Sequence, residues 1–235
     1  MGKMESILRI DESHRVIFDD FRNIKLDEKA DMIFADPPFG IGFKSNLLTY
    51  HRTPDAVSYV EVPREEYPQF IRSLLEWSYG TLEVSGSMWL LSGWNNLGMV
   101  LDAVDESGFR LLNHCIWKYQ FGVFTKRRFT TSHYHLLLLV KDPDDYTFNK
   151  PEHYAEDVWP IKRPYQRQVE TAGNELPDRL VEKCVHTSSN KGDLVVDPVL
   201  GSGTTMKACL QMGRQCIGIE INPALETRIK TKTRC

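Results

Sequence analysis

The sequence predicts an α/β fold with an open sheet and a ligand site at one edge of that sheet. Short apolar runs, such as residues 32–35 and 88–91, alternate with segments whose apolar residues recur at helical spacing. Two of the apolar runs end in an acid followed by a turn, at Asp36 and at Asp197. Because ligands of open α/β sheets bind at the carboxyl ends of the strands, we expect these acids to belong to a functional site.

The elements follow one another in βαβ order. Strands are predicted at residues 15–18, 32–35, 87–91, 111–119, 135–140, 194–196 and 215–219. Helices are predicted at residues 64–80, 97–106, 177–184 and 206–212, and Asn222-Pro223 is expected to open a last one. Residues 44–63 show no periodicity and are interpreted as a long functional loop.

Composition limits the possible classes of protein. A chain of 235 residues, 41% hydrophobic and 26% charged, fits one α/β domain over residues 1–235 with room for a small insertion. The net charge of -3 argues against nucleic acid wrapped around the whole surface, although it permits one basic face.

The cysteines and the apolar segments suggest a cytoplasmic protein. The five cysteines are odd in number and contain no C-x-x-C pair, so neither a disulfide framework nor a zinc knuckle is indicated, and no metal is expected. No apolar stretch reaches the roughly 18 residues of a membrane span, and the N-terminus lacks a signal-type apolar core. We therefore expect a soluble protein in a reducing cytosol.

The tetrapeptide Asp36-Pro37-Pro38-Phe39 closes the strand at residues 32–35. Two consecutive prolines cannot donate hydrogen bonds to a β-ladder, so strand pairing must stop at Asp36. The carboxylate, the rigid turn and the Phe39 ring together could hold a planar ring that carries an amine. We therefore interpret this stretch as the catalytic half of a site.

The second half is a strand, a glycine turn, a helix and a strand that ends in Glu220. A nucleotide-triphosphate loop would need a lysine that is absent, and a dinucleotide turn would need glycine where Met206 stands. The remaining interpretation has Asp197 pair with an amino-acid ammonium group, which points to S-adenosylmethionine. Gly201 and Gly203 then let the backbone approach the methionine portion, and Glu220 accepts hydrogen bonds from the ribose hydroxyls.

Two basic clusters are candidates for contact with nucleic acid. Residues 110–141 contain six Lys or Arg and no acid, with aromatic residues between them. The candidate nucleic-acid-binding residues are Lys126, Arg127, Arg128, Lys162, Arg163 and Arg167. The alternative for residues 126–128 is a solvated loop. We interpret Phe124 and Phe129 as packing residues and His133 and His135 as structural.

The motif at residues 36–39, followed later in the chain by the motif at residues 197–205, resembles the β-class amino-methyltransferases of DNA, in which the catalytic motif precedes the cofactor motif. Residues 30–33, 86–87, 117–118, 158–161 and 217–220 match that family too. The resemblance implies a Rossmann-like methyltransferase fold, with a circularly permuted, seven-stranded and mostly parallel sheet that contains one antiparallel strand. It also implies a short target-recognition segment inserted at about residues 142–170.

The resemblance assigns roles residue by residue. Asp36 and the Pro37 carbonyl accept hydrogen bonds from the target amine, Pro38 completes the rigid turn, and Phe39 stacks on a flipped base. The cofactor-binding residues are Asp20, Asn174, Asp197, Pro198, Gly201, Ser202, Gly203, Thr204, Glu220 and Asn222, of which Asp20 is placed at the adenine side and Asn174 at the carboxylate. This sequence departs from the family at four positions: Glu175-Leu176-Pro177 replaces a K-P pair, Val199-Leu200 a Phe-containing turn, His135 a Glu and Phe39 a Tyr.

The function expected from the resemblance is methyl transfer from S-adenosylmethionine to the exocyclic N6 of an adenine flipped out of double-stranded DNA. Adenine members of the family tend to show Asp at the first motif position and cytosine members Ser, so Asp36 favours adenine. The alternatives are an N4-cytosine enzyme, an RNA adenine methyltransferase and a catalytically silent nucleic-acid-binding subunit. Family members often dimerise, and a bacterial, archaeal or phage source is expected.

Overall fold

A computed structural model describes residues 6–41, 61–120, 122, 124–163 and 175–234. Its strands are β1 (Ser6–Arg9), β2 (His14–Phe18), β3 (Ala30–Ala35), β4 (Leu82–Ser92), β5 (Arg110–Lys118), β6 (His133–Val140), β7 (Val158–Pro160), β8 (Leu194–Asp197) and β9 (Gln215–Ile219). Its helices are α1 (Tyr67–Thr81), α2 (Leu97–Glu106), α3 (Asp178–Ser188), α4 (Thr204–Met212) and α5 (Glu226–Lys232), and three short 3-10 turns are η1 (Phe21–Asn23), η2 (Trp94–Asn96) and η3 (Pro223–Leu225).

The strands form one mixed sheet in the order β1-β2-β9-β8-β3-β4-β6-β5-β7. Pairing is parallel from β2 through β9, β8 and β3 to β4, and β6 runs antiparallel to both β4 and β5. All seven predicted strands form, so the Rossmann-like class of α/β fold is confirmed. The described sheet nevertheless has nine strands rather than seven, because β1 and β7 extend its two edges, and it has two antiparallel strands rather than one, because β1 as well as β6 runs against the others.

The two edge strands were missed because each is short and carries a weak pattern. β1 has three exposed residues among its four, and it pairs with β2 in an antiparallel ladder. β7 has three residues and ends at Pro160, which suits a strand with a partner on one side. Since β7 pairs with β5, part of the predicted insertion extends the main sheet.

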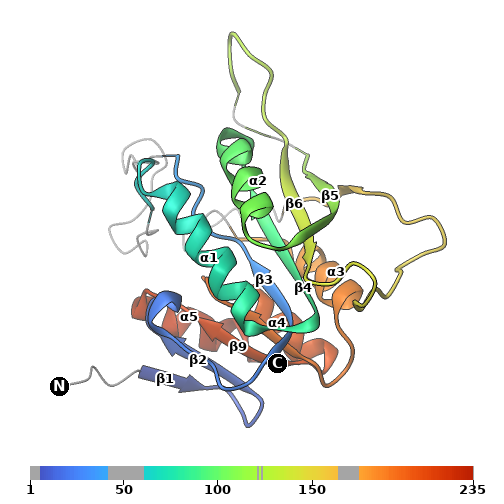
Figure 1. Ribbon diagram of the computed structural model, residues 1–235. Coiled ribbons are helices and arrows are strands. Elements are labelled where there is room, and N and C mark those ends of the chain that lie inside the picture. Colours follow the sequence, from blue (N-terminus) through green and yellow to red (C-terminus); the bar gives the residue numbers. More distant parts are fainter. Residues whose placement is uncertain (1–5, 42–60, 121, 123, 164–174, 235) are drawn as a thin grey trace.

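Helices cover both faces of the sheet (Figure 1). The α1 and α2 helices pack on one face, while α3, α4 and α5 pack on the other. Alternation along β3 sends Met32 and Phe34 into the second layer and Ile33 and Ala35 into the first, as a strand buried on both faces requires. None of the helices in the described ranges is long and apolar enough to cross a membrane.

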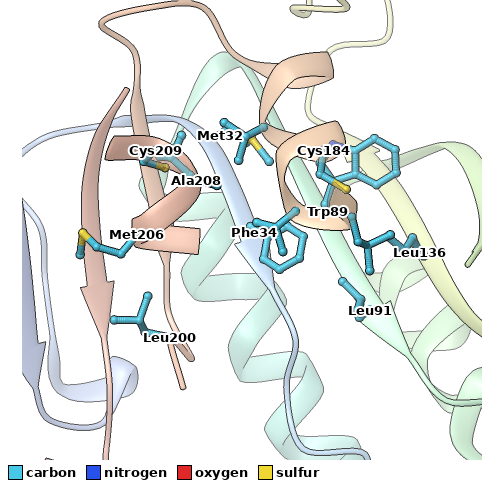
Figure 2. Packing of buried hydrophobic residues seen from close by; sticks show 14 of the residues in the cluster. Met32, Phe34, Trp89, Leu91, Leu136, Cys184, Leu200, Met206, Ala208 and Cys209 are labelled. Carbon is cyan, nitrogen blue, oxygen red and sulfur yellow. The ribbon is translucent and has the colours of Figure 1, made fainter. Parts of the chain in front are cut away.

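Figure 2 shows part of the core beneath α3 and α4, with Phe34 and Trp89 from the sheet, Cys184 from α3 and Met206 from α4. Trp89 is fully buried, and its indole N–H donates to the Ser188 hydroxyl over 2.9 Å, so the one polar atom of this large side chain is satisfied. Four cysteines of the described chain are buried and unpaired: Cys115, Cys184, Cys209 and Cys216.

The glycine turn after β8 rests on β9 through a close contact. The Leu200 amide donates to the Ile219 carbonyl over 2.9 Å. A Cβ atom added to Gly218 would lie 2.4 Å from the Leu200 side chain. Gly218 therefore leaves room for Leu200, and with it the turn, to sit close to the sheet.

We expect Gly218→Ala to lower the free energy of unfolding by about 1–3 kcal/mol, because the added methyl group displaces buried Leu200. Urea unfolding measures the change. Gly98→Ala is the matched control: Gly98 is exposed on α2 and its added Cβ meets nothing within 4 Å. That substitution should stabilise the protein by about 0.5–1 kcal/mol. Equal effects of the two substitutions would contradict this packing role.

Candidate cofactor and target-base site

The functional residues gather at the carboxyl edge of the parallel strands. β3, β8 and β9 end side by side, so Asp36, Asp197 and Glu220 come to one edge although up to 184 residues separate them along the chain. They line one cavity of about 660 Å³. The other predicted cofactor or catalytic residues that line this cavity are Asp20, Pro38, Pro198, Gly201, Ser202, Thr204 and Asn222.

Local hydrogen bonds fix the cofactor half of the cavity. The Asp197 carboxylate accepts from the Val199 amide at 3.0 Å and from the Thr205 hydroxyl at 2.6 Å. One oxygen of Glu220 accepts from the Gly201 amide at 2.7 Å, and the other accepts from the Asn222 amide at 2.8 Å. The turn between them is therefore held by both acids.

Gly203 does not line the cavity but makes the turn possible. Its φ of 89° lies in the left-handed region, which glycine adopts without steric cost. This conformation lets α4 begin directly at Thr204, which lines the cavity together with Ser202. A glycine at position 203 is thus a conformational requirement of the turn, and its close backbone approach to the cofactor stays a prediction.

The cavity is rich in acids, and burial perturbs all three of those at its strand ends. Burial and, second, the negative charge of Asp197 raise the pKa of Asp36 to about 7, against the opposing effect of Arg163. Burial likewise raises the pKa of Asp197 to about 7, although hydrogen bonds from Thr205 and Val199 act in the other direction. Burial also raises the pKa of Glu220. A ligand that brings positive charge would relieve this cost, and S-adenosylmethionine carries an ammonium and a sulfonium group.

Asp20 lines the cavity but is already paired. Its carboxylate caps η1 by accepting from the Arg22 amide at 2.9 Å, and it forms an ion pair with the Arg22 guanidinium at 2.5 Å. Burial acts to raise the pKa of Asp20, but the hydrogen bonds from Arg22 outweigh burial and hold the pKa below its ordinary value. Any contact of Asp20 with a cofactor is therefore made by a charged carboxylate.

Two cations beside the glycine turn were not predicted from the sequence. Arg228 of α5 lines the cavity and pairs with Glu175 at 2.6 Å. Lys232, one turn further along α5, lies 3.3 Å from the same carboxylate and donates to the hydroxyls of Ser202 and Thr204 at 3.1 and 2.6 Å. The basic residues near the C-terminus form no motif, so only their position in the fold shows the contact. Asn174, the residue predicted to bind the cofactor carboxylate, lies outside the described residues.

Only part of the catalytic tetrapeptide, residues 36–39, lines the cavity. Asp36 and Pro38 line the cavity, whereas Pro37 and Phe39 do not. The Phe39 ring lies 5.2 Å from the Tyr134 ring, centroid to centroid, and the Asn96 amide donates to the Phe39 carbonyl at 2.6 Å. Phe39 is thus held on the side of Asp36 that faces β6.

The first basic cluster lies on the loop between β5 and β6, which projects beyond the sheet (Figure 1). Lys126, Arg127 and Arg128 are exposed there. The loop leaves the sheet at the same edge as Asp36, because the start of β6 pairs with the end of β4. The packing interpretation of Phe124 and Phe129 is wrong: their side chains are 79% and 100% exposed, since no element covers this loop in the described part of the chain.

The second basic cluster separates in the structure. Lys162 is exposed, whereas Arg163 is half-buried against aromatic rings. Arg167 lies outside the described residues. Among the histidines, His135 is buried and its Nδ1 lies 2.7 Å from His114 Nε2, while burial and then the neighbouring His114 lower its pKa to about 4. A neutral, buried ring fits the structural role expected for His135.

Comparison with known proteins identifies the family. A family model described as DNA methylase, for N6 and N4 methyltransferases, matches residues 30–231. The chain belongs to this family. It is 27% identical over 226 residues to DNA adenine methyltransferase YhdJ of Escherichia coli (strain K12), and the match covers 83% of this chain and 73% of that protein.

Solved structures agree on the fold of this DNA methylase. The crystal structure of the M1.HpyAVI-SAM complex aligns with a TM-score of 0.73 at 21% identity, over 94% of this chain and 100% of that one. The cytosine-N4-specific PvuII DNA methyltransferase aligns with a TM-score of 0.73 at 16% identity, over 92% of this chain and 86% of that one. In the described part of the methylase, no group of three or more His, Cys, Asp or Glu side chains could hold a metal ion.

The raised pKa values of Asp36 and Asp197 predict how stability depends on pH. Both folded-state values, about 7, lie above the ordinary value of 3.8, so between these pH values the folded protein binds more protons than the unfolded chain. The stability contributed by the two protonated carboxyls is present at low pH and is lost as the pH rises toward 7 and above.

Urea midpoints of the ligand-free protein, measured from pH 5 to pH 8, should therefore fall as the pH rises, and Asp197→Asn should make the fall shallower. Asn at this position keeps an oxygen that can accept from the Val199 amide. Asp105→Asn, on the exposed face of α2, should leave the slope unchanged. A wild-type slope in the Asp197→Asn variant would contradict the raised pKa.

Proposed function

We propose that this DNA methylase transfers the methyl group of S-adenosylmethionine to the exocyclic N6 of an adenine flipped out of duplex DNA. The observation that carries the proposal is the single cavity that joins Asp36, the acid of the catalytic motif, to Asp197 and Glu220, the acids of the cofactor motif. A base whose amine reached Asp36 would therefore lie beside a cofactor held at Asp197.

Different residues of the cavity would bind different groups of the cofactor. Asp197 would pair with its ammonium group, Glu220 would accept from its ribose hydroxyls, and Arg228 would face its carboxylate. Lys232 supports the last contact by holding Ser202 and Thr204. This arrangement supplies the positive charge that the family's K-P pair would bring and that Glu175 cannot. When bound, S-adenosylmethionine supplies an electrophilic methyl group.

Asp36 and the Pro37 carbonyl prepare the amine for attack. An exocyclic amine is a poor nucleophile because its lone pair is delocalised into the ring. By accepting hydrogen bonds from its two N–H groups, Asp36 and the Pro37 carbonyl would favour tetrahedral geometry at the amine nitrogen and aim its lone pair at the methyl group. If the methyl group left the sulfonium sulfur for this nitrogen, the nitrogen would become strongly acidic, and Asp36 would take the released proton and pass it to solvent.

Adenine is favoured over cytosine by two observations. Asp36 occupies the first position of the motif, and YhdJ, an adenine methyltransferase by name, matches most of the chain. The fold itself does not discriminate between the two bases, because the cytosine-N4-specific PvuII enzyme shares it.

The exposed basic loop at residues 126–128 favours a nucleic-acid partner, and residues 142–170 are the proposed target-recognition segment. We also predict a homodimer, which light scattering can test by measuring the molar mass in solution.

Replacement of Asp36 tests the chemistry. Asp36→Ala should lower methyl transfer from labelled S-adenosylmethionine to plasmid DNA by at least about 100-fold, the scale expected when a positioned acid–base group is removed. Cofactor binding, measured by calorimetry, should persist because Asp197 and Glu220 are unchanged. Asp105→Ala is the control with full activity expected. Equal transfer by wild type and Asp36→Ala would overturn the mechanism.

The same reaction separates the alternatives. Mass spectrometry of the digested product should find N6-methyladenine, whereas N4-methylcytosine would identify a cytosine enzyme. Competition between duplex DNA and RNA decides the nucleic acid. Absence of transfer by the wild type, together with retained DNA binding, would favour a silent binding subunit. Methylation-sensitive sequencing of DNA from expressing cells yields the target base and its sequence together.

Replacement of the basic loop tests its role in DNA binding. The triple variant Lys126→Ala, Arg127→Ala, Arg128→Ala should bind duplex DNA more weakly. The slope of log K against log salt should become shallower by roughly 0.9 for each phosphate that the variant no longer neutralises. Lys191→Ala is the control, because Lys191 precedes β8 and so lies at the opposite edge of the sheet. An unchanged salt slope in the triple variant would show that the loop is merely solvated.

A further inference from the structure

Four aromatic side chains form a box next to Asp36: Phe39, Trp117, Tyr119 and Tyr134. They come from the turn after β3, from the end of β5 and from the start of β6, where Trp117 pairs with Tyr134 across the ladder. Tyr134 is the central member, with its ring centroid 5.2 Å from Phe39, 5.6 Å from Tyr119 and 5.7 Å from Trp117. Phe39, the predicted stacking residue, is thus one of four neighbouring aromatic rings.

The Arg163 guanidinium lies against the aromatic box. Its central carbon is 3.9 Å from the Tyr119 ring centroid, 5.1 Å from that of Tyr134 and 5.3 Å from that of Trp117. Planar guanidinium groups stack on aromatic faces as bases do. Arg163 therefore occupies ring surface on which another planar group, such as a base, could stack.

The backbone of Arg163 is anchored while its side chain is incompletely satisfied. Gln120 accepts from the Arg163 amide and donates to the Arg163 carbonyl, both at 2.9 Å, and the Trp117 indole donates to the Ile161 carbonyl at 2.8 Å. The Arg163 Nε–H, in contrast, is buried and has no hydrogen-bond partner among the described residues. A buried donor without a partner is unfavourable, so this side-chain position can be given up when a better occupant arrives.

The position beside Asp36 explains why a cation suits the aromatic box in the absence of DNA. Arg163 attracts the Asp36 carboxylate and lowers its pKa, against the effects of burial and Asp197. Lys162, its neighbour in the chain, is exposed to solvent and takes no part in these contacts. Lys162 and Arg163, two of the three residues of the second basic cluster, therefore differ in environment.

We propose that the Arg163 guanidinium is a placeholder that occupies the stacking surface for the flipped purine and must be displaced from the aromatic box before the target base can enter. This inference rests on the proposed function, because the displacing group is the flipped base. In this role Arg163 competes with the base for the aromatic box, so removal of the guanidinium lowers the free-energy cost of base entry.

The test compares two duplexes that carry the target sequence found by sequencing, one with adenine and one with an abasic site at the target position. Adenine must displace Arg163 to be bound in the flipped state, and the abasic site does not have to. Arg163→Ala should therefore lower the dissociation constant for the adenine duplex relative to that for the abasic duplex. The expected change in their ratio is about tenfold, the scale of a desolvated cation–π contact. Lys162→Ala is the matched control and should weaken both duplexes together, with an unchanged ratio.

Two outcomes would overturn the proposal. An unchanged ratio in Arg163→Ala would make Arg163 a phosphate contact, and weaker binding of the adenine duplex relative to the abasic duplex would mean that Arg163 holds the base.

A measurement without DNA tests the resting position of the Arg163 side chain separately. In the free enzyme the NMR resonances of the Arg163 side chain should be shielded by the rings, and Tyr119→Leu should remove most of that shift. Unshielded resonances would sink the placeholder even if methyl transfer is found. Absence of methyl transfer in the wild type, with shielding present, would instead sink the proposed function.

Discussion

Parallel pairing of β3 with β8 is the constraint on which the site depends. This pairing brings Asp36 and Asp197, 161 residues apart in sequence, to neighbouring strand ends and into one cavity. Each carboxyl is desolvated there, and Asp197 adds its repulsion to the burial of Asp36. The protein tolerates this cost at the point where a cationic cofactor and an amine would reduce it, which is the usual reason for perturbed acids in a cleft.

The cations near the two motifs are held in two different ways. Arg228 and Lys232 are tied to Glu175 beside the glycine turn, so they stay where an anionic group could be bound. Arg163 is anchored through its backbone, and its guanidinium rests on aromatic rings. Fixed cations suit a cofactor that binds in one pose. A displaceable cation suits a base that arrives from a duplex and leaves again.

The chain predicts much of this architecture because the signals are local. Apolar runs indicate all seven strands of the parallel core and its antiparallel neighbour, and the prolines after Asp36 end β3 where expected. The edge strands β1 and β7 escaped prediction because three or four residues carry too little periodicity. The exposure of Phe124 and Phe129 also escaped it, because whether an aromatic residue packs depends on which element covers it.

The sequence by itself determined the class of fold, the two motifs and their order along the chain, since each depends on residues adjacent in the chain. Only the tertiary structure decided which charges meet. The ion pair between Glu175 and Arg228 joins residues 53 positions apart, and the clamp between Gln120 and Arg163 joins residues 43 apart. Contacts of that range follow from strand order and helix packing, which no local pattern encodes.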